Sequence, residues 1–292
     1  MSIPWVQIRQ EMVPLAKQTI ADFQRHKAQW VAAAIAYFAT FAIAPLIIVV
    51  VEIAGLVAGQ HRSVLNHMFA YLSHTAGNSA ARGIQLLVTA AFNQRRSGAI
   101  EQIVGWLVFA LGATGLFTAL QEALNSVWEI ETQKRGLIET IRARAISLGV
   151  VLAIAFLLLV SIGINLALTV ATPALTHVFS YFPTIVKIVD FLISLATFTA
   201  LFALLFKYLP DCRIEWGDVW PGAAATALLF VVGQFLLGWY VGRAGIESLY
   251  GAFGGLVAFL VWVNYSAQMT LLGAEFTHVY SQRYGSRTAK AI

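Results

Sequence analysis

Charged residues are scarce in this 292-residue sequence, and the shortage is the first guide to its fold class. Asp, Glu, Lys and Arg make up 11% of the residues, whereas about 25% is usual for a soluble domain. Each charge-free stretch is long enough to cross a bilayer, which takes about 20 helical residues. The composition predicts an all-α integral membrane protein surrounded by lipid. The charge-free stretches are 28–51, 145–186, 219–241 and 248–274.

Cysteine and the common cofactor motifs are also missing. Cys212 is alone, which excludes an intrachain disulfide and a cysteine metal cluster. There is no P-loop, dinucleotide fingerprint or haem attachment sequence, so no cofactor is expected, nor a pump that hydrolyses its own ATP. His61, His67 and His74 lack the spacing of a metal site, and no metal is predicted.

The apolar runs predict six transmembrane helices. Residues 1–27, before the first span, contain a basic amphipathic helix over 4–27, which either lies on the membrane surface or packs against the ends of the spans. Residues 52–99 form a short helical extracytoplasmic cap with a turn at Gly77-Asn78, and 277–292 form a tail. The predicted spans are 28–51, 103–127, 146–170, 185–206, 219–241 and 251–276.

The basic residues predict the orientation of these spans. Thirteen Lys and Arg fall on the side of the two chain ends and six on the other side. By the positive-inside rule, both termini are cytoplasmic. The same rule explains the net charge of +5 without a nucleic-acid partner. The first 27 residues are too polar for a signal peptide, so the first span is expected to be an uncleaved anchor.

Four segments resemble the YihY/virulence factor BrkB family, which also bears the older label ribonuclease BN. The segments occur in the family's order across nearly the whole chain. The resemblance implies a six-span protein of the bacterial cytoplasmic (inner) membrane, in agreement with the count of apolar runs. The segments are 34–46 (AIAYFATFAIAPL), 112–128 (GATGLFTALQEALNSVW), 209–222 (LPDCRIEWGDVWPG) and 250–275 (YGAFGGLVAFLVWVNYSAQMTLLGAE).

Polar side chains within the predicted spans are the candidate functional residues, because an unpaired ionisable group in lipid costs several kcal/mol. Glu122 either belongs to a functional face or pairs with Arg142 or Arg144, which enter the third span from the same side. Lys187 and Asp190 are spaced as a local ion pair. The candidates for a pathway or a polar bundle interior are Glu122, Asn125, Asn165, Gln234, Asn264, Gln268 and Glu275.

The sixth span combines a polar stripe with a glycine-rich start. Asn264, Gln268 and Glu275 fall close to one helical face, which either lines a water-filled pathway or forms interhelical hydrogen bonds. Gly251 and Gly255 have a G-x-x-x-G spacing, which favours close helix packing and is also compatible with an anion at a helix start.

Proline and glycine also mark positions in the first two spans. Pro45 in the first span removes a backbone N–H, and a kink facing protein is expected there. Gly112 and Gly115 in the second span allow close helix approach.

Three functions were weighed. Transport or permeation of a small solute, ion or lipid is favoured, because buried polar groups should converge inside the bundle. A non-catalytic scaffold for cell-envelope assembly is the alternative, in which those groups serve packing. Nuclease activity is not expected, since the sequence lacks clustered metal ligands beside a basic groove, and the protein is not predicted to be an enzyme. The sequence carries no signal for the oligomeric state.

Overall fold

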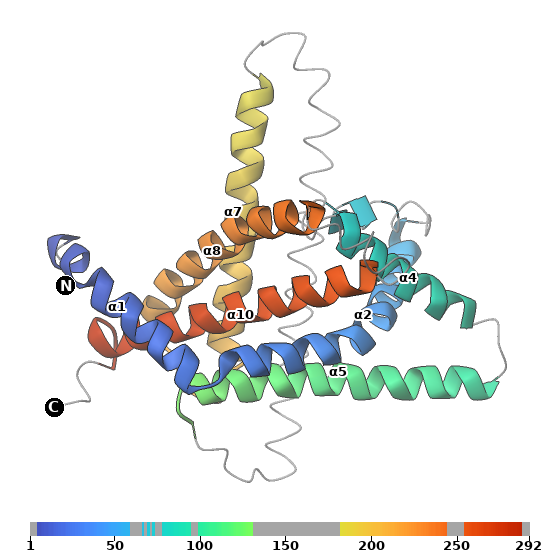
Figure 1. The fold of residues 1–292 in the computed structure, drawn as a ribbon, viewed down its shortest axis with the longest axis horizontal. Coiled ribbons are helices and arrows are strands. Elements are labelled where there is room, and N and C mark those ends of the chain that lie inside the picture. The colour runs from blue at the N-terminus through green and yellow to red at the C-terminus, as the bar shows by residue number, and fades with distance from the viewer. Residues whose placement is uncertain are drawn as a thin grey trace. The chain divides into compact units, whose positions relative to one another are not determined.

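The computed structural model describes residues 5–58, 66, 69–70, 72–73, 78–94, 99–130, 182–243 and 254–287. The prediction of an all-helical chain is confirmed for these residues, which contain helices and no strand. The helices, drawn in Figure 1, are α1 (Trp5–Arg25), α2 (Ala28–Ala58), α4 (Asn78–Gln94), α5 (Ala99–Val127), α7 (Phe182–Tyr208), α8 (Trp216–Arg243) and α10 (Gly254–Arg283).

Five of the six predicted spans overlap these helices. Residues 28–51 lie in α2, 103–127 in α5, 185–206 in α7 and 219–241 in α8, and 251–276 overlap α10. The third predicted span, 146–170, lies outside the described residues. In the segment predicted as a cap, α4 begins at Asn78, the second residue of the predicted turn, and Gly77 lies outside the described residues.

Three helices of the described part of the chain are long and apolar enough to cross a membrane. They are Phe191–Tyr208 in α7, Trp216–Leu237 in α8 and Gly254–Arg283 in α10. A shorter apolar helix covers Ala28–Ile43.

The surface of α8 has the character of a lipid-facing helix. Five large apolar residues between its positions 228 and 236 are at least 45% exposed. Their spacing places them on one stripe of the helix. Soluble monomers seldom expose a continuous apolar stripe of this kind, whereas hydrocarbon accommodates it without cost. The residues of the stripe are Leu228, Leu229, Val232, Phe235 and Leu236.

The chain divides into two compact units. Unit 1 comprises residues 1–26, 124–231 and 270–292, and unit 2 comprises 27–123 and 232–269. Each unit therefore draws on segments that lie far apart in the sequence.

Unit 2 is held together by close approach of helix backbones. A Cβ atom on Gly83 of α4 would overlap the backbone of Gly255 in α10, and one on Gly255 would lie 2.7 Å from the Gly83 nitrogen. Beside this contact, Ala80, Ile84 and Val88 of α4 share a buried core with Ala258 and Phe259 of α10. Gly255, predicted as a packing residue, therefore faces a glycine of the cap helix.

The two glycines predicted in the second span also lie in tight contacts of unit 2. A Cβ on Gly112 would come 2.7 Å from the Cβ of Phe41, and one on Gly115 would overlap the Phe38 ring. These contacts join α5 to α2. Both glycines therefore lie where the two helices pack closely, as predicted.

Unit 1 contains a reciprocal glycine–threonine contact between α8 and α10. A Cβ on Gly222 of α8 would overlap Oγ1 of Thr277, and one on Gly273 of α10 would overlap Oγ1 of Thr226. Each threonine hydroxyl donates to the carbonyl of the glycine four residues earlier, at 2.6 Å from Thr226 and 2.7 Å from Thr277. Both threonine hydroxyl groups therefore donate a hydrogen bond within their own helix, and the two helix backbones can approach closely.

We expect Gly222→Val to destabilise the folded protein by about 1–3 kcal/mol, the usual cost of forcing extra methyl groups into a packed core. Gly217→Val is the matched control, because nothing lies within 4 Å of a Cβ at Gly217 on the same helix. Thermal unfolding in detergent, followed by tryptophan fluorescence, measures the difference. Equal midpoints for the two variants would contradict the close α8–α10 contact, and Thr277→Ala should restore part of the loss in Gly222→Val.

Candidate functional site

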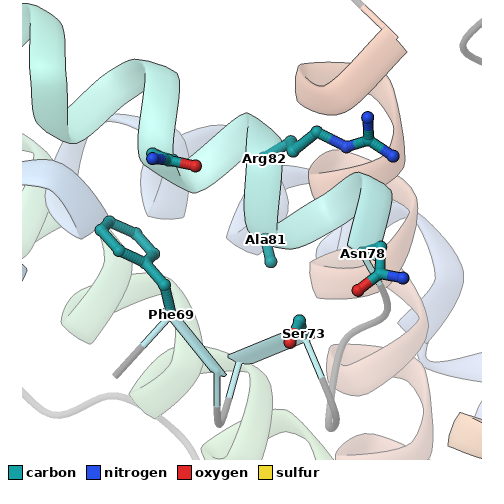
Figure 2. A pocket seen from close by; sticks show the side chains of 6 residues that line it. Phe69, Ser73, Asn78, Ala81 and Arg82 are labelled. Carbon is teal, nitrogen blue, oxygen red and sulfur yellow. The ribbon is translucent and has the colours of Figure 1, made fainter. Parts of the chain in front are cut away.

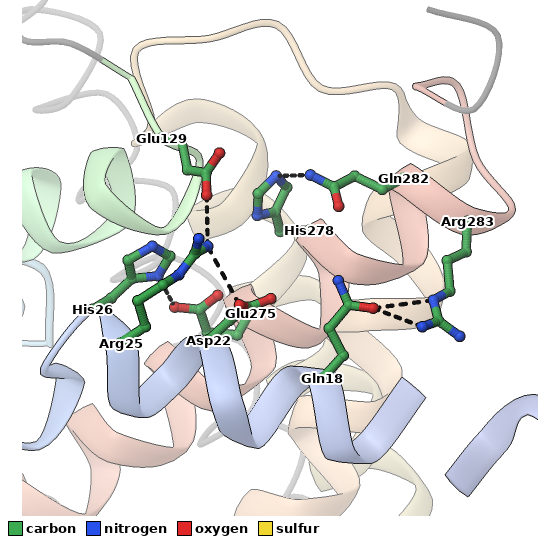
Figure 3. A network of polar contacts seen from close by, with 9 residues as sticks. All are labelled: Gln18, Asp22, Arg25, His26, Glu129, Glu275, His278, Gln282 and Arg283. Atoms are coloured by element: carbon green, nitrogen blue, oxygen red, sulfur yellow. Dashed lines mark hydrogen bonds and ion pairs between the residues drawn. The ribbon is translucent and has the colours of Figure 1, made fainter. Parts of the chain in front are cut away.

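Polar side chains gather in unit 1 where four chain segments come together. The segments are the end of α1, the end of α5, the loop between α7 and α8, and the end of α10 with the turn after it. Figure 3 shows nine of these side chains, which we call the α1–α10 network: Gln18, Asp22, Arg25, His26, Glu129, Glu275, His278, Gln282 and Arg283.

Glu275 is the most deeply buried ionisable group of the network. Its side chain has 0% exposure and lies on α10, a helix apolar enough to span a membrane. Oε1 of Glu275 is 2.6 Å from Nδ1 of His26, whose side chain is 13% exposed. Oε2 is buried and has no hydrogen-bond partner among the described residues. His26 is therefore the group that holds this carboxyl.

The residue after His26 has a left-handed backbone conformation. This residue, Lys27, has a φ of 52°. This left-handed conformation costs a non-glycine residue about 1–2 kcal/mol. Such conformations persist where the surrounding contacts determine them, and the His26–Glu275 contact stands directly beside this one.

Glu129 shows the same conformation at the end of α5. Its φ is also 52°, and the Ile130 N–H donates to the Asn125 carbonyl, as in a Schellman motif. Glycine is the usual residue at this position. Glu129 instead accepts a hydrogen bond of 2.6 Å from Arg25, which also contacts Asp22 at 3.3 Å. Both Arg25 and Glu129 are more than half exposed, so this ion pair contributes at most about 1 kcal/mol.

The first helix packs against α10 in unit 1. Leu15 and Thr19 are buried, and Arg283 donates to the Gln18 side-chain oxygen at 2.7 Å. Together with the His26–Glu275 contact, these observations favour packing of α1 against the end of a span, one of the two roles open from the sequence. Val13 and Ile20, on other faces of α1, are 63% and 52% exposed.

A second buried imidazole lies one turn after Glu275. His278 is 3% exposed, its Nε2 is 2.9 Å from the Gln282 side-chain nitrogen, and its Nδ1 is buried without a partner. The Trp128 ring lies 5.0 Å from the His278 ring, with its own Nε1 buried and unpartnered. On the Trp128 ring rests the guanidinium of Arg287, at 4.7 Å.

The loop between α7 and α8 is fixed by a reciprocal amide–carboxylate pair. The Asn125 side-chain nitrogen donates to Asp211 at 2.8 Å, and the Asp211 backbone N–H donates to the Asn125 oxygen at 2.9 Å. Asn125 was predicted as a pathway candidate, and in the structure both ends of its amide are occupied by this pair.

The same loop contains the sole cysteine of the chain. Burial raises the pKa of the Cys212 thiol, and the neighbouring Arg287 lowers it in part. The thiol is therefore protonated at neutral pH, which makes it a slow nucleophile.

The turn after α10 is tied to the first turn of α8. Asp218, which is 4% exposed, accepts hydrogen bonds from the Ser286 hydroxyl at 2.6 Å and from its backbone N–H at 3.2 Å. The carboxylate at the start of α8 also suits the positive end of that helix. This contact completes the polar end of unit 1.

The remaining pathway candidates are dispersed. Glu122 is exposed on α5. Asn264 and Gln268 satisfy each other, because the Gln268 nitrogen donates to the Asn264 oxygen at 2.6 Å along α10. Gln234 is half-buried on α8, and its side-chain nitrogen has no partner among the described residues.

Several predicted residues are not tested by side-chain positions. Asn165, Arg142, Arg144 and Gly251 lie outside the described residues, as do the pairings proposed for the two arginines. Lys187 and Asp190 lie in α7, and Pro45 lies in the uninterrupted helix α2, but the placement of these side chains is also outside the described part. The predicted kink at Pro45 stays a prediction.

Unit 2 contains a separate pocket at the start of α4. Its volume is about 210 Å³, and it opens to the surface between α4 and the preceding segment (Figure 2). Figure 2 shows Phe69 and Ser73 on one side and Asn78, Ala81 and Arg82 of α4 on the other. In the described ranges no group of three or more His, Cys, Asp or Glu could hold a metal ion.

Sequence reasoning missed His26 and His278. Glu275 was singled out, but its partner lies 249 residues earlier, in a polar segment where a histidine has no unusual context. The Glu275-x-x-His278 spacing on an apolar helix was the one available signal, since residues three apart share a helical face.

A family model described as "Virulence factor BrkB" matches residues 19–291. A "UPF0761 membrane protein" of Tolumonas auensis is 32% identical over 191 residues, 64% of this chain and 60% of that protein. Proteins of that name from Saccharophagus degradans and Pseudomonas aeruginosa are each 26% identical over 90% of this chain, and over 58% and 61% of their own lengths. The chain thus spans about three fifths of these relatives. No solved structure matches it.

Proposed function

Since this chain belongs to the virulence factor BrkB family of membrane proteins, we propose that it moves a small solute, an ion or a lipid across a bacterial inner membrane, without catalysing a reaction. The observation that carries the proposal is Glu275, a carboxyl group with no exposure on a helix able to span the membrane. An ionisable residue at such a position costs several kcal/mol, and function is the usual reason for keeping it.

Buried polar atoms without partners support the same function. Each costs about 1–3 kcal/mol when it is left unsatisfied. Apolar side chains of similar size would avoid that cost if these positions served packing alone. A passing polar solute or water would satisfy such groups. The atoms without partners among the described residues belong to Trp128, Gln234, Trp262, Glu275 and His278.

We propose that the basic segments of unit 1 face the cytoplasm. Unit 1 contains the amino-terminal segment, the loop after α5, the loop between α7 and α8 and the tail, which are the four segments with the excess of Lys and Arg. Basic loops are retained on the cytoplasmic side. Arg25, Arg283 and Arg287 lie in this unit.

Labelling of single cysteines tests this orientation. Cys212 is a poor reporter because it is half-buried, so Cys212→Ser provides the background. In it, Glu215→Cys and Asn78→Cys each introduce a thiol at an exposed position, in unit 1 and unit 2 respectively. A membrane-impermeant maleimide added to intact spheroplasts should label the second variant, and label the first only after permeabilisation. The opposite pattern would reverse the proposed orientation.

Flux measurements test the function itself. The purified full chain is reconstituted in liposomes, and tracer flux is measured for a panel of anions, cations and labelled lipids. Glu275→Gln should reduce the flux of the transported species by about tenfold or more, because a hydrogen bond to a charged group contributes about 1.5–3 kcal/mol.

Glu215→Gln is the matched control, an exposed carboxyl at the same end of unit 1. Its flux should equal that of the parent protein. If folded, inserted protein moves none of the tested species, the transport proposal is wrong, and the alternative of a scaffold for cell-envelope assembly gains support.

A further inference from the structure

The two oxygens of Glu275 have different surroundings. Oε1 contacts Nδ1 of His26 at 2.6 Å, whereas Oε2 is buried and has no hydrogen-bond partner among the described residues. A carboxylate in this position leaves half of its charge unsolvated, which is costly in an apolar environment. A carboxyl group that has taken up a proton carries no such charge. The geometry therefore suits a group that alternates between the two forms.

The arginine side chains of the network and the turn after α10 contact groups other than Glu275. From α1, Arg25 contacts Asp22 and, after α5, Glu129. Arg283 contacts the neutral Gln18, and Arg287 lies over the Trp128 ring. Among the described residues, His26 is thus the ionisable group within hydrogen-bond distance of Glu275.

Polar atoms continue from Glu275 along α10. Nδ1 of His278, one turn later, and Nε1 of Trp128, packed against the His278 ring, are both buried and unpartnered. Because the Gln282 amide contacts Nε2 of His278 at 2.9 Å and can donate to it, Nδ1 carries the hydrogen of the neutral ring in that arrangement. A carboxyl group, two imidazoles and an indole N–H at one buried place are the parts of a proton-handling site.

We propose that Glu275 is a proton-binding site, with His26 as the group through which the proton enters and leaves. His26 is partly exposed and joins the buried carboxyl to the surface. One O–H bond of a hydronium ion breaks as an N–H bond forms at Nε2 of His26. The N–H bond at Nδ1 of His26 breaks as an O–H bond forms on the Glu275 carboxylate, so the imidazole ends neutral. The charge of the pair rises by one, no oxidant or reductant is needed, and release reverses the step. Resting on the proposed transport function, we assign this proton as its coupling ion.

Infrared difference spectroscopy of the full chain in lipid nanodiscs tests the site without any transported solute. Spectra are compared between about pH 8 and about pH 6, a range in which exposed carboxyl groups stay almost fully ionised. The parent protein should gain the C=O stretch of a protonated carboxyl group over this range. Glu275→Gln should lose that band, and the control Glu215→Gln should keep it. An unchanged band in Glu275→Gln, or no band in the parent protein, overturns the proposal.

A second variant keeps the proposal testable if Glu275→Gln does not fold. His26→Leu keeps the carboxyl group, removes the imidazole and puts no N–H donor in its place. The band should then appear at a pH about one unit higher than in the parent protein, because the carboxylate has lost an N–H donor to its charged form. An unmoved midpoint would show that His26 does not share the proton, and the proposed site would be wrong.

The infrared and flux results separate the two proposals. A Glu275-dependent band in a protein that moves no tested species would leave the proton site standing and remove the transport function. Flux that depends on Glu275 without the band would do the reverse. With both present, flux should rise in a pH gradient imposed across the liposome membrane, and lose that dependence in Glu275→Gln.

Discussion

The burial of one carboxyl group on an apolar helix governs the arrangement of unit 1. An unpaired charge there would cost several kcal/mol, and removing one partner of a buried pair commonly costs about 3–5 kcal/mol. The partner comes from the amino-terminal helix, so α1 must return to α10. The Gln18–Arg283 contact and the burial of Leu15 accompany that packing of α1.

The fold also depends on close approach between helices. Lipid provides no hydrophobic drive between helices, so spans associate through packing and hydrogen bonds. Gly222 and Gly273 let α8 and α10 approach in unit 1, and Gly83 and Gly255 do the same for α4 and α10 in unit 2. In unit 1 the Asp218–Ser286 contact joins the start of α8 to the turn after α10. Small residues thus set the backbone positions, and polar pairs fix the ends.

Helices followed from sequence more readily than contacts did. The charge-free run 28–51 predicted α2, and the Gly77-Asn78 turn signal predicted a helix start near α4. Both signals are local, because they depend only on residues that are neighbours in the sequence. The polar network depends on pairs that are distant in sequence, such as His26 with Glu275 and Asn125 with Asp211, 249 and 86 residues apart. No local pattern encodes them. The Gly-x-x-x-Thr spacing of Gly222 and Gly273 was present, but it matches many helices that never meet.

A double-mutant cycle on the His26–Glu275 pair tests the account most directly. Thermal unfolding in detergent is measured for His26→Leu, Glu275→Gln and the double variant. If the buried pair governs unit 1, the double variant loses less stability than the two single losses added together, by about 1.5–3 kcal/mol. Additive losses would mean that the two side chains do not interact in the folded protein, and would contradict the account.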